Sequence, residues 1–332
     1  MNAFVDVSAG ISPLGPSKKV RARIRKAIKG LRCYPDSEAR ALKKLFLSKY
    51  GIRAENMCLA NSLHELVYSI AAIVKPKKVL VLGPALRIYE EASSAAGADT
   101  FYFSPDEHTG YITDTDQLRK KIKNCNLLFA ANPNRINGRL IHKEVFDLMR
   151  SEACTRKVPF VIDESLIEFT GAESYHSYVN DMKNVIVLQT TALFYGLPGL
   201  ELAYAITSPE MVIALKNRQC STINHLALEA ARAAFKDNAY KKNLKKYIDT
   251  EKEYIKKKIK KTDGVTFMDS DSNVFLLKLS DNREILLRSL KRAGLRIQDC
   301  EHIDGLREHY LRLSVLKHDY NSKLLRIITD GL

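Results

Sequence analysis

The sequence predicts an α/β fold: a large domain with a mostly parallel sheet between helices, followed by a smaller C-terminal α/β domain. Two patterns predict it. Short apolar runs alternate with segments of amphipathic helical spacing from about Lys78 onward, which is typical of parallel strands joined by covering helices. After Ser208 the pattern changes to long helical stretches and then two further strand-like runs. A chain of 332 residues can bury a large core and a smaller one.

The expected elements can be placed in chain order. Apolar runs predict strands that begin at Val79, Leu127, Pro159, Asn184 and Glu201. The intervening spacing predicts helices over 86–97, 114–123 and 142–150. In the C-terminal part, we expect an amphipathic helix over 240–261, strands from Val274 and Leu311, and a helix over 283–293. The corresponding domain division is an N-terminal arm with a small-domain segment (1–33), a large domain (34–208) and a small domain (209–332).

Composition excludes several classes of protein. No apolar run reaches the roughly 18–20 residues that a membrane-spanning helix needs, and the N-terminus lacks the pattern of a signal peptide. We therefore expect a cytoplasmic protein. Its six cysteines form no CxxC pair and have no histidine at ligand spacing, so we expect reduced core thiols and neither a metal site nor a disulfide framework.

The formal net charge of +15 raises the question of an acidic partner or nucleic acid. Much of the excess lies in the predicted helix over 240–261, whose lysines alternate with apolar residues at helical spacing. We favour a solvated basic face, because no recognised nucleic-acid-binding motif accompanies the charge.

Residues that follow the predicted strands are the first candidates for chemistry, because ligands of open α/β sheets bind beyond the carboxyl ends of the strands. The strand from Leu127 leads into the turn-rich string NPNRINGR at 132–139. The next strand ends at the acid pair Asp163–Glu164. The strand from Asn184 leads into ALFYGLPGL at 192–200, a loop with two glycines and a proline.

These strings, in this order, resemble the class I/II aminotransferases, and most closely histidinol-phosphate aminotransferase and threonine-phosphate decarboxylase. The resemblance also covers ISPLGPS from Ile11, YPDSEARALKKLFLSKYGI from Tyr34, SNVFLLKL from Ser272 and YLRLSV from Tyr310. It implies the fold-type I transferase fold, whose large domain has a mostly parallel sheet of seven strands. It also implies pyridoxal phosphate (PLP) as cofactor and an active site shared across a homodimer.

Three residues match positions that the resemblance associates with cofactor and substrate. Asp163 matches the carboxylate at the pyridine nitrogen, which makes the ring an electron sink. Tyr89 matches the aromatic that packs on the ring, and Arg312 the arginine that pairs with a substrate carboxylate. Structural alternatives are a helix-capping acid, a core tyrosine and a surface arginine. The resemblance further implies cofactor contacts from Asn61 and Tyr195 and a substrate contact from Tyr34.

Four other positions depart from the family pattern. Leu193 stands where the Schiff-base lysine is expected, and leucine cannot form an imine. Glu201 replaces an arginine that helps to hold the cofactor phosphate, and Leu63 replaces a phosphate-binding serine. Arg135 replaces the asparagine that bonds the pyridine 3-oxygen. The opposite charges of Arg135 and Glu201 could also pair with each other.

No other residue is assigned the role of the missing Schiff-base lysine or of a catalytic base. Lys183 lies at the start of its strand rather than at its end, and Lys216 belongs to a later helix, so neither is assigned to the imine position. His64 is interpreted as a surface residue near a helix start rather than as a catalytic base.

Three functional interpretations follow. The favoured one is a degenerate homologue without transaminase activity, acting as a binding or regulatory subunit, because several site positions fail together. It would form a homodimer, or a heterodimer with a related active aminotransferase, and could take a small amino-acid-like ligand. The second is an active aminotransferase or amino-acid-phosphate decarboxylase that binds PLP non-covalently. The third is an acidic-partner or nucleic-acid binder that uses the helix over 240–261.

Overall fold

A seven-stranded sheet forms the centre of the large domain. The computed structural model describes residues 4–105, 114–219, 221–280, 283–306 and 309–331. The strands of the sheet are β2 (Met57–Ala60), β3 (Lys78–Leu82), β4 (Asp99–Phe103), β5 (Leu127–Ala131), β6 (Phe160–Asp163), β7 (Val185–Thr190) and β8 (Ala203–Ile206). They lie in the order β2-β8-β7-β6-β5-β3-β4. Strands β3 to β7 pair in parallel, whereas β8 is antiparallel to both of its neighbours. The predicted mostly parallel sheet is confirmed.

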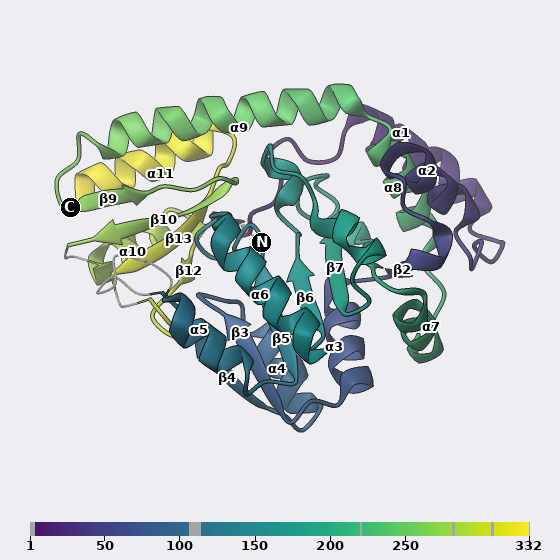
Figure 1. Ribbon diagram of the computed structural model, residues 1–332. Coiled ribbons are helices and arrows are strands. Elements are labelled where there is room, and N and C mark those ends of the chain that lie inside the picture. The colour runs from purple at the N-terminus through teal and green to yellow at the C-terminus, as the bar shows by residue number, and fades with distance from the viewer. Residues whose placement is uncertain (1–3, 106–113, 220, 281–282, 307–308, 332) are drawn as a thin grey trace.

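Helices cover both faces of this sheet (Figure 1). The helices up to residue 235 are α1 (Lys18–Ala27), α2 (Arg40–Tyr50), α3 (Leu63–Val74), α4 (Ile88–Ala95), α5 (Thr115–Ile122), α6 (Lys143–Arg156), α7 (Pro209–Arg218) and α8 (His225–Phe235). Successive strand residues point to opposite faces. Accordingly, Leu80 and Leu128 join the buried cluster that includes α5 and α6, whereas Val79 and Leu127 join the cluster that includes α3, α4 and α7.

The C-terminal part forms a smaller α/β unit. Its antiparallel sheet has the order β12-β13-β10-β9, made of β9 (Val265–Met268), β10 (Val274–Leu279), β12 (Gln298–Asp299) and β13 (Tyr310–Ser314). Its helices are α9 (Asn238–Ile259), α10 (Arg283–Arg292) and α11 (His318–Gly331). Near the N-terminus, β1 (Val5–Asp6) pairs in parallel with β11 (Leu295–Arg296). Figure 1 shows α9 running from the region of α1 and α8 to the small sheet, where it lies beside α11.

The expected elements are present with small shifts at their ends, except that α6 continues to Arg156, six residues beyond the expected end at 150. Six strands were not anticipated: β2 and β4 of the large sheet, and β1, β9, β11 and β12 outside it. Strand β2 has the sequence MCLA, which lacks the β-branched and aromatic residues that indicate a strand. Strand β4 lies at the edge of the sheet and is only partly buried, so its residues form no continuous apolar run.

The N-terminal arm lies against the loop that follows β7. The Ser12 amide donates to the Leu193 carbonyl at 2.8 Å. In the same loop, Gly196 adopts a φ of +65°, and a Cβ at this position would lie 2.7 Å from the Gly15 carbonyl carbon. Glycine is therefore required here both for the left-handed backbone and for the close approach of the arm.

The structure corrects the expectation that all cysteines are core thiols. Cys33 and Cys154 are exposed, whereas Cys58, Cys125 and Cys300 are buried. The sixth cysteine, Cys220, lies outside the described residues. Within the described ranges, no cluster of His, Cys, Asp and Glu could hold a metal ion, and no helix is long and apolar enough to cross a membrane.

Candidate functional site

Asp163 is the centre of a buried hydrogen-bond cluster at the end of β6. Its side chain is 1 % exposed. One carboxylate oxygen, Oδ2, accepts from the Tyr89 hydroxyl at 2.6 Å and from Arg135 Nη1 at 3.2 Å. The other, Oδ1, accepts from the Ser165 amide at 2.9 Å and from the Ser165 hydroxyl. A carboxylate has about four acceptor positions. All of those on Asp163 therefore accept from donors of the chain itself.

The loop after β5 directs Arg135 toward Asp163. Asn134 Oδ1 accepts from the amides of Ile136 and Asn137 at 2.9 and 3.1 Å, which fixes a tight turn around residue 135. The Arg135 side chain is 13 % exposed. Its Nε is buried and has no hydrogen-bond partner within the described part of the chain. The guanidinium is thus held by its ion pair with Asp163 and is largely withdrawn from solvent.

The Tyr89 ring packs against another side chain of this chain. It stacks on Phe129 of β5, with centroids 5.1 Å apart and planes 24° apart. Burial raises the pKa of Tyr89 well above its usual value, and the neighbouring Asp163 carboxylate raises it further. The phenol therefore remains neutral and acts as a fixed donor to Asp163.

Arg312, on β13, is 4 % exposed. Its Nε donates to the Arg135 carbonyl at 2.9 Å, and its Nη1 donates to the Ser8 carbonyl. Burial lowers the pKa of Arg312 to about 10, and the nearby Arg135 charge contributes in the same direction. The side chain is still charged at neutral pH, and these two donors bind backbone oxygens of two other segments.

Leu193 belongs to the hydrophobic core and is 7 % exposed. Its carbonyl accepts from the amides of Ser12 and Gly196. The two lysines considered as substitutes have other contacts. Lys183 pairs with Glu210 at 3.4 Å, and Lys216 pairs with Glu38 at 2.8 Å.

Glu201 places its carboxylate at the N-terminus of α3. Its Oε1 accepts from the Leu63 amide, the first of the helix, at 3.1 Å and from the Thr190 hydroxyl at 2.7 Å. The next part of the helix start has its own cap, since Ser62 Oγ accepts from the Glu65 amide at 3.1 Å. The suggestion that Arg135 and Glu201 pair with each other is therefore wrong: each charged group binds a different partner at its own end of the site.

The remaining predicted residues lie around this site in different environments. Asn61 bonds the segment before α8, through the Asn224 amide at 3.0 Å. Tyr195 is buried, and its hydroxyl donates to Glu168 at 2.9 Å. Tyr34 is 96 % exposed, and His64 is exposed, as the surface interpretation of that histidine predicted.

PLP does not fit the residues as they are arranged here. A pyridine nitrogen would need an acceptor position on Asp163 that Tyr89, Arg135 and Ser165 already use. A phosphate at the start of α3 would meet the Glu201 carboxylate, and repulsion between like charges is costly where solvent is restricted. Position 193 offers no amine to form an imine.

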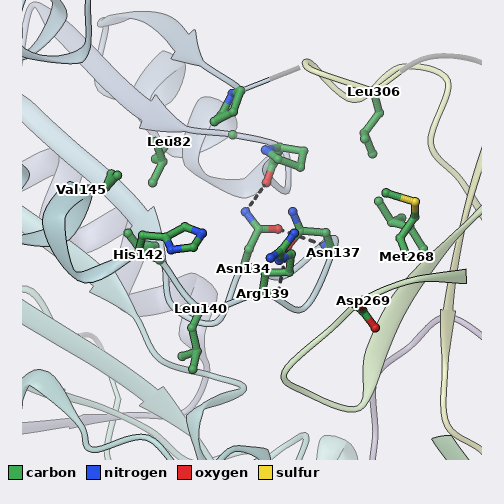
Figure 2. Close-up of a pocket in the computed structure, with 15 residues that line it drawn as sticks. Leu82, Asn134, Asn137, Arg139, Leu140, His142, Val145, Met268, Asp269 and Leu306 are labelled. Carbon is green, nitrogen blue, oxygen red and sulfur yellow. Dashed lines mark hydrogen bonds between the residues drawn. The ribbon is translucent and has the colours of Figure 1, made fainter. Parts of the chain in front are cut away.

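A cavity of about 110 Å³ lies between the ends of β3 and β5 and the small domain (Figure 2). On one side Asn134 donates to the Pro84 carbonyl at 2.8 Å, and on the other side lie Met268, Asp269 and Leu306. None of Asp163, Tyr89 and Leu193 lines it. The cavity is thus separate from the Asp163 cluster.

Sequence reasoning missed two residues that complete the site. Ser165 donates twice to Asp163, a contact that a side-chain acceptor followed two residues later by a small polar residue could have indicated. Thr190 lies within the altered TTAL string but was given no role, because its contact with Glu201 joins the ends of two strands that only the folded sheet brings together.

Comparison with known proteins agrees with this architecture. The model of the family described as aminotransferase class I and II matches residues 3–328. Threonine-phosphate decarboxylase from Salmonella typhimurium is 23% identical, over 99% of this chain and 91% of that protein. The crystal structure of histidinol-phosphate aminotransferase from Clostridium acetobutylicum superposes with a TM-score of 0.90 at 27% identity, covering 98% of each chain. The corresponding enzyme from Sinorhizobium meliloti, in complex with pyridoxal-5'-phosphate, gives a TM-score of 0.87 at 19% identity, over 99% of this chain and 90% of that one. The expected fold-type I architecture is confirmed.

Proposed function

This chain belongs to the aminotransferase class I and II family, and we propose that it is a member without transaminase activity that acts as a binding or regulatory subunit. The observation that carries the proposal is Leu193, a buried aliphatic side chain where the resemblance expects the Schiff-base lysine. An aminotransferase needs an amine there, both to hold the cofactor and to move the proton at the substrate's α carbon.

The environment of the site supports the same proposal. The substitutions at 135 and 201 both introduce charges that bind groups of the chain itself, Asp163 in one case and the start of α3 in the other. Arg312 directs two of its donors at backbone carbonyls rather than at solvent. Lost catalysis explains the substitutions at 63, 135, 193 and 201 together, whereas altered substrate specificity would leave the cofactor contacts intact.

We further propose that the subunit acts within a dimer, with a second copy or with a related active aminotransferase. Tyr34 supports this, because a tyrosine ring that is 96 % exposed contacts little of its own chain, and the resemblance places it at a site shared between subunits. Light scattering of the purified chain should give the mass of a dimer, or an affinity-tagged relative should retain the chain; a chain that is monomeric alone and is not retained would contradict the proposal.

The activity proposal is tested on the purified full chain. We expect no absorbance band of an imine after incubation with excess PLP, no phosphopyridoxyl adduct by mass spectrometry after borohydride reduction, and no transamination of histidinol phosphate. An adduct on any side chain, or turnover above a heat-denatured control, would show that the proposal is wrong.

Non-covalent use of PLP is the alternative within the same family, and the retained Asp163 is the observation that favours it. It predicts that PLP absorbance shifts when an amino acid is added, since the substrate amine would then form the imine. A protein that leaves the PLP spectrum unchanged with and without amino acids excludes this alternative.

Binding of an acidic partner or nucleic acid through α9 is a second alternative, favoured by the exposed lysines Lys242, Lys246 and Lys257. Other lysines of the helix are already engaged: Lys241 pairs with Glu168 at 2.8 Å, and Lys256 with Asp269 at 3.0 Å. Titration of a generic duplex over a range of salt tests this alternative, because phosphate contacts weaken steeply as salt rises. No binding at low salt would exclude it.

A further inference from the structure

Two positions that depart from the family pattern meet in the folded chain. Leu63 and Glu201 lie 138 residues apart, yet the Leu63 amide donates to the Glu201 carboxylate. The sheet brings them together, because Ala203 of β8 pairs with both Ala60 of β2 and Thr190 of β7. The loop before β8 is thereby held beside the start of α3.

The start of α3 is a favourable place for a negative charge. The first amides of a helix lack partners within the helix, and the helix dipole adds a partial positive charge there. α3 has 12 residues, and its first amide points at Glu201 Oε1 at 3.1 Å. The Thr190 hydroxyl binds the same oxygen at 2.7 Å. These are the contacts that a bound anion would make at a helix N-terminus.

At the end of β6, two strands away from β8 in the same sheet, the charge arrangement is reversed. There the buried Asp163 carboxylate would attract a cation, and Arg135 supplies one from the loop after β5 at 3.2 Å. The chain thus places an anion where an anion is favoured and a cation where a cation is favoured. Both groups come from its own side chains.

We propose that Glu201 is an internal ligand, which fills an anion site at the N-terminus of α3, while Arg135 fills the matching cation position at Asp163. Both positions are then occupied by the chain's own side chains when nothing is bound. This inference rests on the proposed function, but its test measures stability and phosphate binding rather than transamination, so the two can fail separately. Its consequence is that removing the Glu201 carboxylate opens a site for an external anion.

Thermal unfolding of the full chain tests this, with inorganic phosphate as the probe and chloride of matched ionic strength as the reference. Glu201→Ala should lower the melting temperature by about 2–5 °C, since a capping contact and a charge–dipole interaction are lost together. Phosphate should recover at least half of that loss in Glu201→Ala. It should raise the melting temperature of the parent much less.

Glu253→Ala is the matched control, because Glu253 is exposed on α9 and its removal changes the net charge by the same amount. It reports any unspecific effect of phosphate on this basic protein. Equal phosphate shifts in Glu201→Ala and Glu253→Ala, or a Glu201→Ala protein that melts with the parent, would overturn the inference.

Glu201→Gln keeps the test decisive if the alanine variant does not fold. The amide oxygen can still accept from Leu63 and Thr190, but the negative charge is lost. We expect a melting temperature below that of the parent, with no phosphate recovery because the side chain still fills the site. A glutamine variant as stable as the parent would show that the carboxylate is not held as an anion.

Discussion

Arg135 Nη1 lies 3.2 Å from Asp163 Oδ2, and the two side chains are 13 % and 1 % exposed. The resemblance assigns Asp163 and the residue at position 135 to different atoms of one small molecule. In the folded chain they bind each other, which joins the loop after β5 to the end of β6. A buried ion pair contributes little net stability, but the loss of one partner is costly because the other charge stays buried.

Arg135→Asn should therefore lower the free energy of unfolding by about 2–4 kcal/mol. The measurement is urea denaturation at pH 7. Arg21→Asn is the control, because Arg21 is exposed on α1 and makes no ion pair within the described residues; it should change stability by less than about 0.5 kcal/mol. Similar values for the two variants would mean that the pair with Asp163 is dispensable.

Tyr89→Phe should cost about 1–2 kcal/mol, because the stacked ring is kept while Asp163 loses a buried donor. The exposed Tyr68 provides the control, and Tyr68→Phe should be close to neutral. Combined with Arg135→Asn in a double-mutant cycle, Tyr89→Phe should not be additive, since both donors serve the same carboxylate oxygen. Strict additivity would argue against a shared cluster.

Leu193→Lys alone should not create a PLP enzyme. A lysine in this core position is destabilising, because a buried amine without a partner is desolvated. Glu201 would still bind the start of α3, and Arg135 would still bind Asp163. We expect an imine absorbance band with PLP only when Glu201→Arg and Arg135→Asn are added. Leu197→Lys, at another buried position of the same loop, is the control. A stable imine in the single Leu193→Lys variant would contradict the proposal that Glu201 and Arg135 occupy the positions that the cofactor would need.

Glu164 should make stability depend on pH. It is fully buried beside Ser174 and Gln189, and burial raises its pKa from 4.5 to about 7 despite hydrogen bonds that act in the opposite direction. The folded state then holds its proton more tightly than the unfolded state, so this contribution is fully present below pH 4.5 and is lost as the pH rises through 7.

The corresponding measurement is the free energy of unfolding at pH 5 and pH 7.5 for the parent and for Glu164→Gln. The parent should lose up to about 1.4 kcal/mol per pH unit relative to the variant over this interval. Glu253→Gln, an exposed counterpart, should follow the parent. If Glu164→Gln has the same pH dependence as the parent, the carboxyl of Glu164 is ionised throughout the range.

Sequence patterns predicted the elements that are indicated by the spacing of apolar residues within one segment of the chain. The strand predicted over VFLLKL is observed as Val274–Leu279. A short continuous apolar run is typical of a strand that is buried on both faces of a covered sheet. The amphipathic helix is observed as α9, with Leu244 and Ile255 buried at helical spacing. Strand β2 could not be predicted, because its residues MCLA include no β-branched or aromatic side chain and the strand forms by pairing with β8.

The sequence by itself determined the family, the fold and the absence of an amine at position 193, because these depend on residue identity and order along the chain. Only the tertiary structure decided where the new charges act. Arg135 and Glu201 have opposite signs and could have neutralised each other, yet β8 holds Glu201 at the start of α3, and the turn around Asn134 directs Arg135 at Asp163. Electrostatic pairing depends on distance and desolvation, and long-range contacts between strands and loops set both of these.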